Sequence, residues 1–164
     1  MSEHKVVIIL GSKSDLSFAT SIGKVLEEYN VNYEYNVASA HKTPEHLLKI
    51  LKRYETSELN IVYITIAGLS DALSGFVAGF TRYPVVACPP DSEKRGWYKV
   101  FSTVVTPKGV AVSFVFEPAN AALTAIKILA LSNPTLYEKI NFFKRLKEEE
   151  ILKSNLEVKM KKES

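Results

Sequence analysis

Three short polar stretches of this sequence combine small residues, hydroxyl groups and charged side chains. They are the first loop (residues 11–15, Gly-Ser-Lys-Ser-Asp), the second loop (residues 39–44, Ser-Ala-His-Lys-Thr-Pro) and the third loop (residues 67–71, Ala-Gly-Leu-Ser-Asp). Each one leads into a stretch with helical periodicity. The free backbone N–H groups and the dipole at the start of a helix favour an anion. The three loops therefore predict a site for a phosphorylated small molecule.

His41, in the second loop, is the side chain best suited to carry a proton, since imidazole titrates near neutral pH. The chain has three histidines. His4 lies in the amino-terminal extension and His46 on a predicted helix, where a solvated or packing role is expected. Lys42 could neutralise a phosphate or simply be solvated, and the residue type alone does not decide between the two.

The first loop matches neither a Walker A loop nor a dinucleotide-binding fingerprint. Taken alone, it is better interpreted as a turn in which Ser14 or Asp15 caps the following helix. Its proximity to the other two loops favours a binding role, in which Asp15 accepts hydrogen bonds from ribose hydroxyls or a ring amine. Asp71 in the third loop could likewise cap a helix or face the ligand.

Metal and thiol chemistry are disfavoured by the spacing of the remaining side chains. No second His, Cys or carboxylate stands at metal-ligand spacing to His41, so we expect no metal. The single cysteine, Cys88, precedes Pro89 and Pro90 and is more simply a buried residue at a strand end than a nucleophile. One cysteine also cannot form an internal disulfide.

Apolar runs and helical periodicity alternate along the chain and define the elements that must position these loops. Strands are predicted over residues 6–10, 33–37, 61–67, 85–88 and roughly 110–116. Helices are predicted over residues 16–26, 44–54, 73–80 and 118–131, with a short helical piece around 97–101 and a long amphipathic helix from about 135. Residues 91–96 are polar and without periodicity, and we expect roughly the last ten residues to fray.

This alternation predicts an α/β fold in which a parallel five-stranded sheet lies between two helical layers. The strand order 2-1-3-4-5 of a flavodoxin-like three-layer sandwich is expected, with a carboxy-terminal helical extension. In such a sheet all strands end at one edge, so the three loops must open on the same side. The length favours one domain over residues 1–164, with about 135–164 forming the final helix and tail.

Composition excludes several classes of function. Hydrophobic residues make up 46% and charged residues 24% of the chain, as in ordinary globular proteins. The formal charge is +3, and the basic tail is interleaved with acidic residues, which is atypical of a nucleic-acid-binding surface. We therefore expect no nucleic-acid partner. No secretory signal or membrane-spanning run is recognisable, so no membrane partner is expected and the cytoplasm is the expected location.

Four segments together resemble the PurE family over nearly the whole chain: GSKSD, SAHKTPEH, AGLSDALSGFVAGFTRYPVVACPP and NAALTAIKILAL. The resemblance implies a flavodoxin-like enzyme of purine biosynthesis that works without metal, biotin or a bound nucleotide cofactor. It also implies a homo-oligomer, commonly an octamer. The apolar stretch of residues 121–131 and the aromatic pair Phe142 and Phe143 are expected to meet other copies.

The family has two classes, which differ in the third loop. Mutases move a carboxyl group from the exocyclic nitrogen of N5-carboxyaminoimidazole ribonucleotide to ring carbon 4, and typically carry AGGAAHLPG. Carboxylases add CO2 directly to 5-aminoimidazole ribonucleotide (AIR) to give 4-carboxy-5-aminoimidazole ribonucleotide (CAIR), and typically carry AGRSN followed by CPP. The present chain reads AGLSDALSG followed by CPP, which resembles the carboxylases. Leu69 and Asp71 depart from the Arg and Asn usual there.

The resemblance implies that His41 is the catalytic proton carrier and that Gly68 and Ser70 hold the ring and the carboxyl group. Phosphate and ribose binding is implied for Ser12, Asp15, Ser39 and Lys42, and the neighbouring residues expected to line the substrate site are Gly11, Ser14, Ala40, Ala67 and Asp71. Two alternatives stay open. The chain could be a mutase of the same family, or a flavodoxin-like module that binds a phosphorylated metabolite without catalysis.

Overall fold

The computed structural model describes residues 3–90 and 100–160 of the chain. Its five strands are β1 (His4–Leu10), β2 (Tyr33–Val37), β3 (Asn60–Ile66), β4 (Val85–Ala87) and β5 (Ser113–Phe114). They form one parallel sheet in the order β2-β1-β3-β4-β5, which confirms the predicted topology. The residues predicted for a polar segment at 91–96 and for most of the helical piece at 97–101 lie outside the described residues.

The last two strands of the sheet, β4 and β5, are shorter than predicted. Only Ser113 and Phe114 of the predicted 110–116 strand pair with β4. β4 ends early because Pro89 and Pro90 follow Cys88, and proline has no N–H to donate to a neighbouring strand. Few residues of β4 are therefore available to pair with β5. Pro118 then starts the next helix, which leaves little room for a longer strand.

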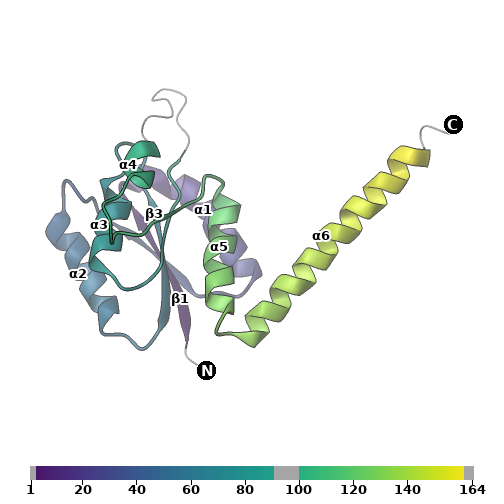
Figure 1. Cartoon of the computed structure of the whole chain (residues 1–164), viewed down its shortest axis with the longest axis horizontal. Coiled ribbons are helices and arrows are strands. Elements are labelled where there is room, and N and C mark those ends of the chain that lie inside the picture. The colour runs from purple at the N-terminus through teal and green to yellow at the C-terminus, as the bar shows by residue number, and fades with distance from the viewer. Residues whose placement is uncertain (1–2, 91–99, 161–164) are drawn as a thin grey trace.

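Helices cover both faces of the sheet (Figure 1). On one face α1 (Leu16–Glu28) and α5 (Pro118–Ala130) pack on alternate strand residues such as Val6, Ile8 and Leu10. On the other face α2 (Pro44–Glu55) and α3 (Ala72–Phe80) pack on Val7 and Ile9. Because both faces are covered, the central strands are buried almost throughout, as their continuous apolar sequence predicted.

The start of α1 differs from the prediction. A short 3-10 turn, η1 (Lys13–Asp15), precedes α1, and the cap belongs to Ser12 in place of Ser14 or Asp15. The Ser12 hydroxyl accepts from the Ser14 N–H, and the Asp15 carboxylate accepts from the Ser12 N–H, which together form a capping box. The extra turn moves the cap towards the amino terminus.

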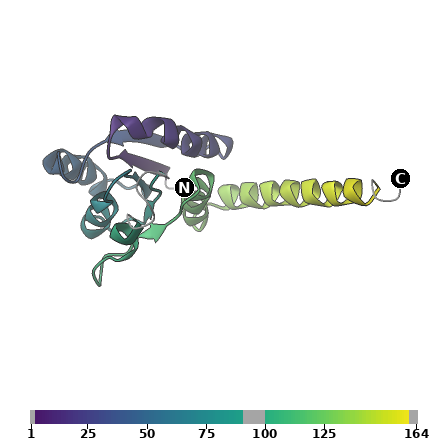
Figure 2. The ribbon, with the colours of Figure 1, turned by 90° about the horizontal axis from the view of Figure 1, so that it is seen from above.

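The last helix, α6 (Pro134–Met160), is longer than predicted and extends away from the sheet (Figures 1 and 2). Its first turns pack on the core through Leu136 and Ile140, whereas residues 144–160 are all exposed. The expected fraying of the last ten residues is wrong up to Met160, because Glu, Lys and Leu are strong helix formers and no glycine or further proline interrupts them. No helix in residues 3–90 and 100–160 is long and apolar enough to span a bilayer.

A charged cluster around Glu34 fastens the edge strand β2 to its neighbours. Glu34 accepts from Lys5 on β1 at 3.3 Å, from Asn36 at 2.9 Å, and from both Arg53 and Tyr54 on α2. Partial burial acts to raise the pKa of Glu34. This effect is outweighed by the hydrogen bonds that Glu34 accepts from Tyr54, Asn36 and Lys5 and by the charge of Arg53, and the pKa is lowered to about 2. The cluster therefore stabilises the strand that leads into the second loop.

We expect Glu34→Gln to destabilise the fold at pH 7 by about 1 kcal/mol, since hydrogen bonds to a charged group are lost. The pKa of Glu34 is lowered in the folded state, so its contribution is present above the ordinary glutamate value of 4.5 and disappears as pH falls towards about 2. Urea unfolding at pH values from 7 to 2 should show the difference from the parent protein shrinking over that window. A difference that stays constant, or one matched by Glu58→Gln at an exposed position, would contradict this role for Glu34.

Candidate active site

The three loops leave the sheet side by side because three strands end at the same level. In the parallel register, Leu10 at the end of β1 pairs with Val37 of β2 and with Ile66 of β3. Two backbone hydrogen bonds extend this alignment into the loops. The Gly11 N–H donates to the Ile66 carbonyl at 2.8 Å, and the Ala38 N–H donates to the Leu10 carbonyl at 2.9 Å.

A pocket of about 120 Å³ opens between the loops. It is lined by most of the residues predicted from the sequence, namely Gly11, Asp15, Ser39, Ala40, His41, Lys42, Ala67, Gly68 and Ser70. Leu69 and Leu73 also line it. Ser12, Ser14 and Asp71 are not on its wall. The structure thus brings the three loops around one cavity, while these last three side chains bond within the loops and to the helices.

Ser12 and Ser14 of the first loop face each other. Besides its bond from the Ser14 N–H, the Ser12 hydroxyl oxygen lies 3.0 Å from the Ser14 hydroxyl. The Asp15 carboxylate of the same loop does reach the pocket. Burial raises the pKa of Asp15 above its ordinary value, and the hydrogen bond from the Ser12 N–H acts in the opposite direction. Asp15 is therefore a half-buried acceptor held in place by its own loop.

The second loop closes on itself around Ser39. The Ser39 carbonyl accepts from the Thr43 N–H at 2.9 Å, and the Ser39 hydroxyl accepts from the Lys42 N–H at 3.2 Å. Thr43 occupies the predicted cap position of α2, but its hydroxyl accepts from the Ser39 N–H at 2.9 Å and makes no bond to the helix. This closed turn places the side chains of His41 and Lys42 at its exposed tip, on the wall of the pocket.

Neither His41 nor Lys42 makes a side-chain hydrogen bond or an ion pair with any part of the chain that the structure describes. The imidazole is therefore free to meet a ligand from either ring nitrogen, and the ammonium group is free to meet an anion. A proton carrier needs this freedom, because it must reach the atom that loses the proton.

The third loop ends in a buried anchor, Asp71, which caps α3. Asp71 is 2% exposed, and one carboxylate oxygen accepts from the Ser74 N–H at 3.0 Å. The other accepts from the Thr103 hydroxyl at 2.8 Å. Of the two roles that the sequence left open for Asp71, the structure shows capping. Gly68 of the same loop faces Asp15 and Pro90, since a Cβ atom on Gly68 would lie 3.6 Å and 3.5 Å from them.

From the sequence, Leu69 stands out only as a departure from the family pattern, and neither Leu73 nor the link from Thr103 is predicted. Leu73 is the first buried residue of α3, so its helical spacing could have placed it close to the third loop. Leu69 is 54% exposed and forms part of the rim. Thr103 has no signal in the sequence, because it meets Asp71 across 32 residues of chain.

Cys88 is buried at the end of β4, as its sequence context suggested. Its thiol is fully inaccessible and donates to the Phe116 carbonyl at 3.6 Å. Burial, with a smaller effect from the charge of Glu117, raises its pKa to about 12, so the thiolate that nucleophilic chemistry needs is suppressed. Within residues 3–90 and 100–160 no group of three or more His, Cys, Asp and Glu side chains could hold a metal ion.

The arrangement supplies three chemical functions at one cavity. Helix starts and Lys42 favour an anionic group, Asp15 accepts hydrogen bonds from hydroxyl or amine groups, and His41 can take or give a proton. The Gly68 to Ser70 stretch contributes the wall from the third loop. A small molecule that carries a phosphate and a reactive centre fits these functions better than a nucleic acid or an apolar ligand.

Comparison with known proteins points to one family. Residues 5–150 match the family model described as AIR carboxylase. The chain is 44% identical to a phosphoribosylaminoimidazole carboxylase of Archaeoglobus fulgidus over 94% of its own length and 85% of the relative's. A carboxylase of Treponema denticola is 36% identical over 94% and 97% of the two chains. An N5-carboxyaminoimidazole ribonucleotide mutase of Methanocaldococcus jannaschii is also 36% identical, over 94% and 97%.

Solved structures agree with the sequence matches. The crystal structure of Treponema denticola PurE superposes with a TM-score of 0.89 at 36% identity and covers 92% of this chain and 96% of that one. The crystal structure of a variant of the Treponema protein gives a TM-score of 0.90 at the same identity. Family model, relatives and fold therefore agree with the loops around the pocket: the chain belongs to the AIR carboxylase, or PurE, family.

Proposed function

We propose that this protein carboxylates AIR at ring carbon 4 with CO2 and so forms CAIR in purine biosynthesis. The observation that carries the proposal is the gathering of His41, Asp15 and the histidine-free third loop around one pocket. Family membership supports the substrate class, since relatives named phosphoribosylaminoimidazole carboxylase align over nearly the whole chain.

The phosphate binds where the first and second loops meet, with Ser39 and Lys42 as its side-chain partners. Free N–H groups at the start of the helices add to the attraction. Ser12 and Ser14 hold the shape of the first loop through their mutual contact. Asp15 accepts hydrogen bonds from the ribose hydroxyls or from the ring amine. In the third loop, the Gly68 to Ser70 wall holds the imidazole ring and the carboxyl group.

The reaction needs orientation and one base. Carbon 4 of AIR is an electron-rich, enamine-like carbon that attacks the carbon of CO2, so that a C–C bond forms and the electron pair moves to a carboxylate oxygen. Carbon 4 then carries both its hydrogen and the new carboxylate, and the ring has lost its aromaticity. His41 removes that proton, and the C–H electron pair restores the aromatic ring of CAIR. Alignment of the two reactants and this proton transfer supply the catalysis.

The mutase reaction is the second candidate, because the Methanocaldococcus jannaschii relative is named as a mutase at 36% identity. The third loop argues against it. Mutases of the family typically place a histidine in this loop, whereas here Ser70 and Asp71 occupy that stretch and Asp71 is buried as a helix cap. Binding without catalysis is disfavoured by His41, since a pure binding module has little need of a titratable group at the pocket.

Replacing the proposed base tests the mechanism directly. We expect His41→Asn to lower kcat by about 10²-fold or more, because a general base acts on the transition state. The Kd for AIR, measured by calorimetry without bicarbonate, should change little. His46→Asn, at an exposed position on α2, is the matched control and should retain parental turnover. Parental turnover by His41→Asn would remove His41 from the mechanism.

The class assignment predicts that CO2 itself is the substrate. The purified protein with AIR and bicarbonate, and without ATP, should accumulate CAIR at a rate set by dissolved CO2. N5-carboxyaminoimidazole ribonucleotide decarboxylates spontaneously, so it is tested fresh and with a CO2 trap present. Rapid conversion of that compound under the trap, with no carboxylation in bicarbonate alone, would assign the protein to the mutases.

We also propose that the protein works as a homo-oligomer, with an octamer preferred over a tetramer. A pocket of about 120 Å³ is small, since sites for small ligands usually measure about 300–1,000 Å³. A second copy would add to its walls. Part of the expected contact surface is excluded, because Ala121, Ala122 and Ala125 of α5 are buried in this protomer's own core, whereas Leu131 at the end of that stretch is 87% exposed.

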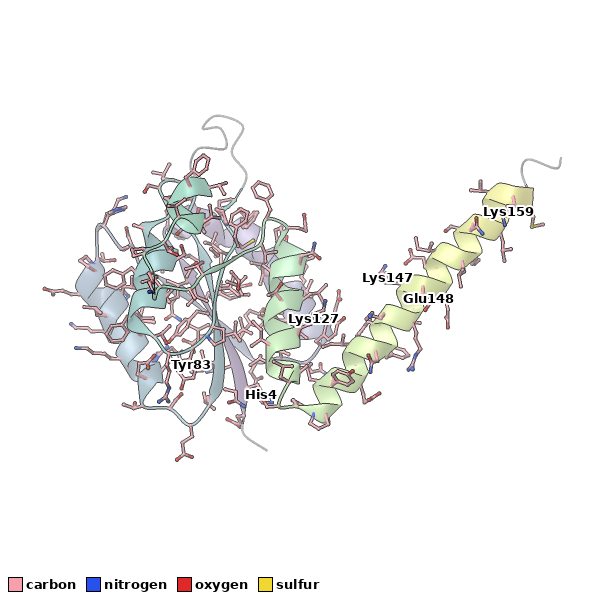
Figure 3. The ribbon with its side chains drawn as sticks, in the orientation of Figure 1. His4, Tyr83, Lys127, Lys147, Glu148 and Lys159 are labelled. Carbon is pink, nitrogen blue, oxygen red and sulfur yellow. The ribbon has the colours of Figure 1, made fainter. Side chains whose placement is uncertain are left out.

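The exposed part of α6 is the stronger support for assembly. Figure 3 shows Lys147, Glu148 and Lys159 along the part of this helix that extends away from the sheet. At about 100° per residue, four exposed apolar side chains share one side of the helix. They are Phe142, Leu146, Leu152 and Leu156, with exposed fractions of 50%, 42%, 56% and 61%.

A second apolar line runs along the other side of the same helix. Ile151 and Val158, both 69% exposed, continue the line of Leu136 and Ile140, which pack on this protomer's core. Charged side chains interrupt both lines, with Glu149 and Lys153 on the first side and Lys147 on the second, so each line is a partly apolar strip. Two neighbouring copies would cover the two strips, which favours an assembly larger than a dimer.

Assembly is tested with two substitutions at adjacent positions of α6. Leu156→Asp should shift the mass measured by light scattering towards smaller species, because a charge then enters an apolar interface. Asn155→Asp adds the same charge off both apolar lines and should leave the mass unchanged. A parent protein that is a stable monomer at micromolar concentration would contradict the proposal, and a tetramer would overturn only the preference for an octamer.

A further inference from the structure

The third loop is fastened from outside the proposed active site by a short helix, α4 (Phe101–Val104). The Ser102 hydroxyl accepts from the Asp71 backbone N–H at 2.9 Å. The Thr103 hydroxyl donates to the Asp71 carboxylate at 2.8 Å. Two consecutive residues of α4 thus hold both the main chain and the side chain of Asp71. Neither belongs to the three loops that define the pocket.

Burial makes the contact with Thr103 specific. Thr103 is 1% exposed and Asp71 is 2% exposed, so water cannot replace either partner. Asp71 uses one carboxylate oxygen for the Ser74 N–H of α3 and the other for Thr103, which leaves neither oxygen without a donor. A buried carboxylate that loses one donor must shift or find another, because an unsatisfied buried charge is costly.

Within the described residues, this anchor fixes one end of a loop whose middle is not buried. Ala67, which follows β3, is buried at 8% exposure, and Asp71 is the next buried residue along the chain. The residues between them are half-buried Gly68 and exposed Leu69 and Ser70, and these three line the pocket. The position of the pocket wall therefore depends on two fixed ends, and α4 sets one of them.

We infer that Ser102 and Thr103 are positioning residues that hold the Gly68 to Ser70 wall at the distance the reaction needs. The inference rests on the proposed function, in which this wall holds the ring and the carboxyl group. The phosphate site proposed on the first and second loops draws no residue from α4. Loss of the anchor should therefore disturb the position of the imidazole ring and the carboxyl group. It should leave the phosphate, which provides most of the binding, in place.

The test compares Thr103→Val, which removes the hydroxyl and keeps the side-chain shape, with Thr103→Ser, which keeps the hydroxyl. Thr103→Val should lower kcat by about tenfold or more, since small misplacements of reacting groups are costly. Its KM for AIR should stay within about threefold of the parent, and Thr103→Ser should stay within about twofold in kcat. Ser102→Ala should follow Thr103→Val in direction.

Thr65→Val is the matched control for the chemical change. Thr65 lies on β3, is 1% exposed, and its hydroxyl has no partner within the described residues. The same substitution there should leave both kcat and KM at parental values. If Thr103→Val lowers the thermal midpoint but leaves kcat at the parental value, α4 is only a structural brace and the inference is overturned. Equal loss of kcat in Thr103→Ser and Thr103→Val would overturn it as well.

Amide hydrogen exchange of residues 67–72 separates this inference from the proposed function. Exchange in this stretch should be faster in Thr103→Val than in the parent and in Thr103→Ser. A parent protein that does not carboxylate AIR would refute the proposed function, while faster exchange would still uphold α4 as the anchor of the loop. Unchanged exchange in Thr103→Val and Ser102→Ala would overturn the inference whatever the activity.

Discussion

The parallel pairing of β1 with both β2 and β3 is the constraint on which the rest of the molecule depends. Because Leu10 pairs with Val37 and with Ile66, the three strands end level, and the chain must leave all three at the same edge. Every group proposed to bind or react follows within a few residues of those ends. A register slip of one residue would turn each strand's side chains to the opposite face, so the two apolar cores on either side of the sheet also hold the loops in line.

Close helix packing maintains this register. The Tyr33 and Tyr35 side chains of β2 reach so close to α1 that a Cβ atom on Gly23 would lie 2.3 Å from the Tyr35 hydroxyl and 2.8 Å from that of Tyr33, so a larger residue would force these rings to move. On the other face the Glu34 cluster joins β2 to α2, whose start closes the second loop. The loops need little regular secondary structure, because capping hydrogen bonds fix their conformation and the strand ends fix their position. Exposed His41 and Lys42 can then remain free for a ligand at little cost to the fold.

Much of the fold and of the pocket follows from the sequence, because continuous apolar strands alternate with amphipathic helices and each loop carries its own chemical signature. Local signals fail where contacts between distant residues decide. The Ser12 cap depends on an extra 3-10 turn, and the length of β5 depends on how many residues of β4 can pair with it. The role of Asp71 depends on Thr103, which lies 32 residues away. The length of α6 exceeds the prediction for a different reason, since its second half is exposed in the protomer and depends on helix propensity.

We propose that the three loops form one ribonucleotide site with His41 at the reacting end. A crystal structure of the protein with AIR bound, in the absence of CO2, tests it most directly. We expect the phosphate at Ser39 and Lys42, the imidazole ring against the Gly68 to Ser70 wall, and carbon 4 within reach of a nitrogen of His41. AIR bound at the opposite edge of the sheet, or bound between the loops with carbon 4 turned away from His41, would contradict it.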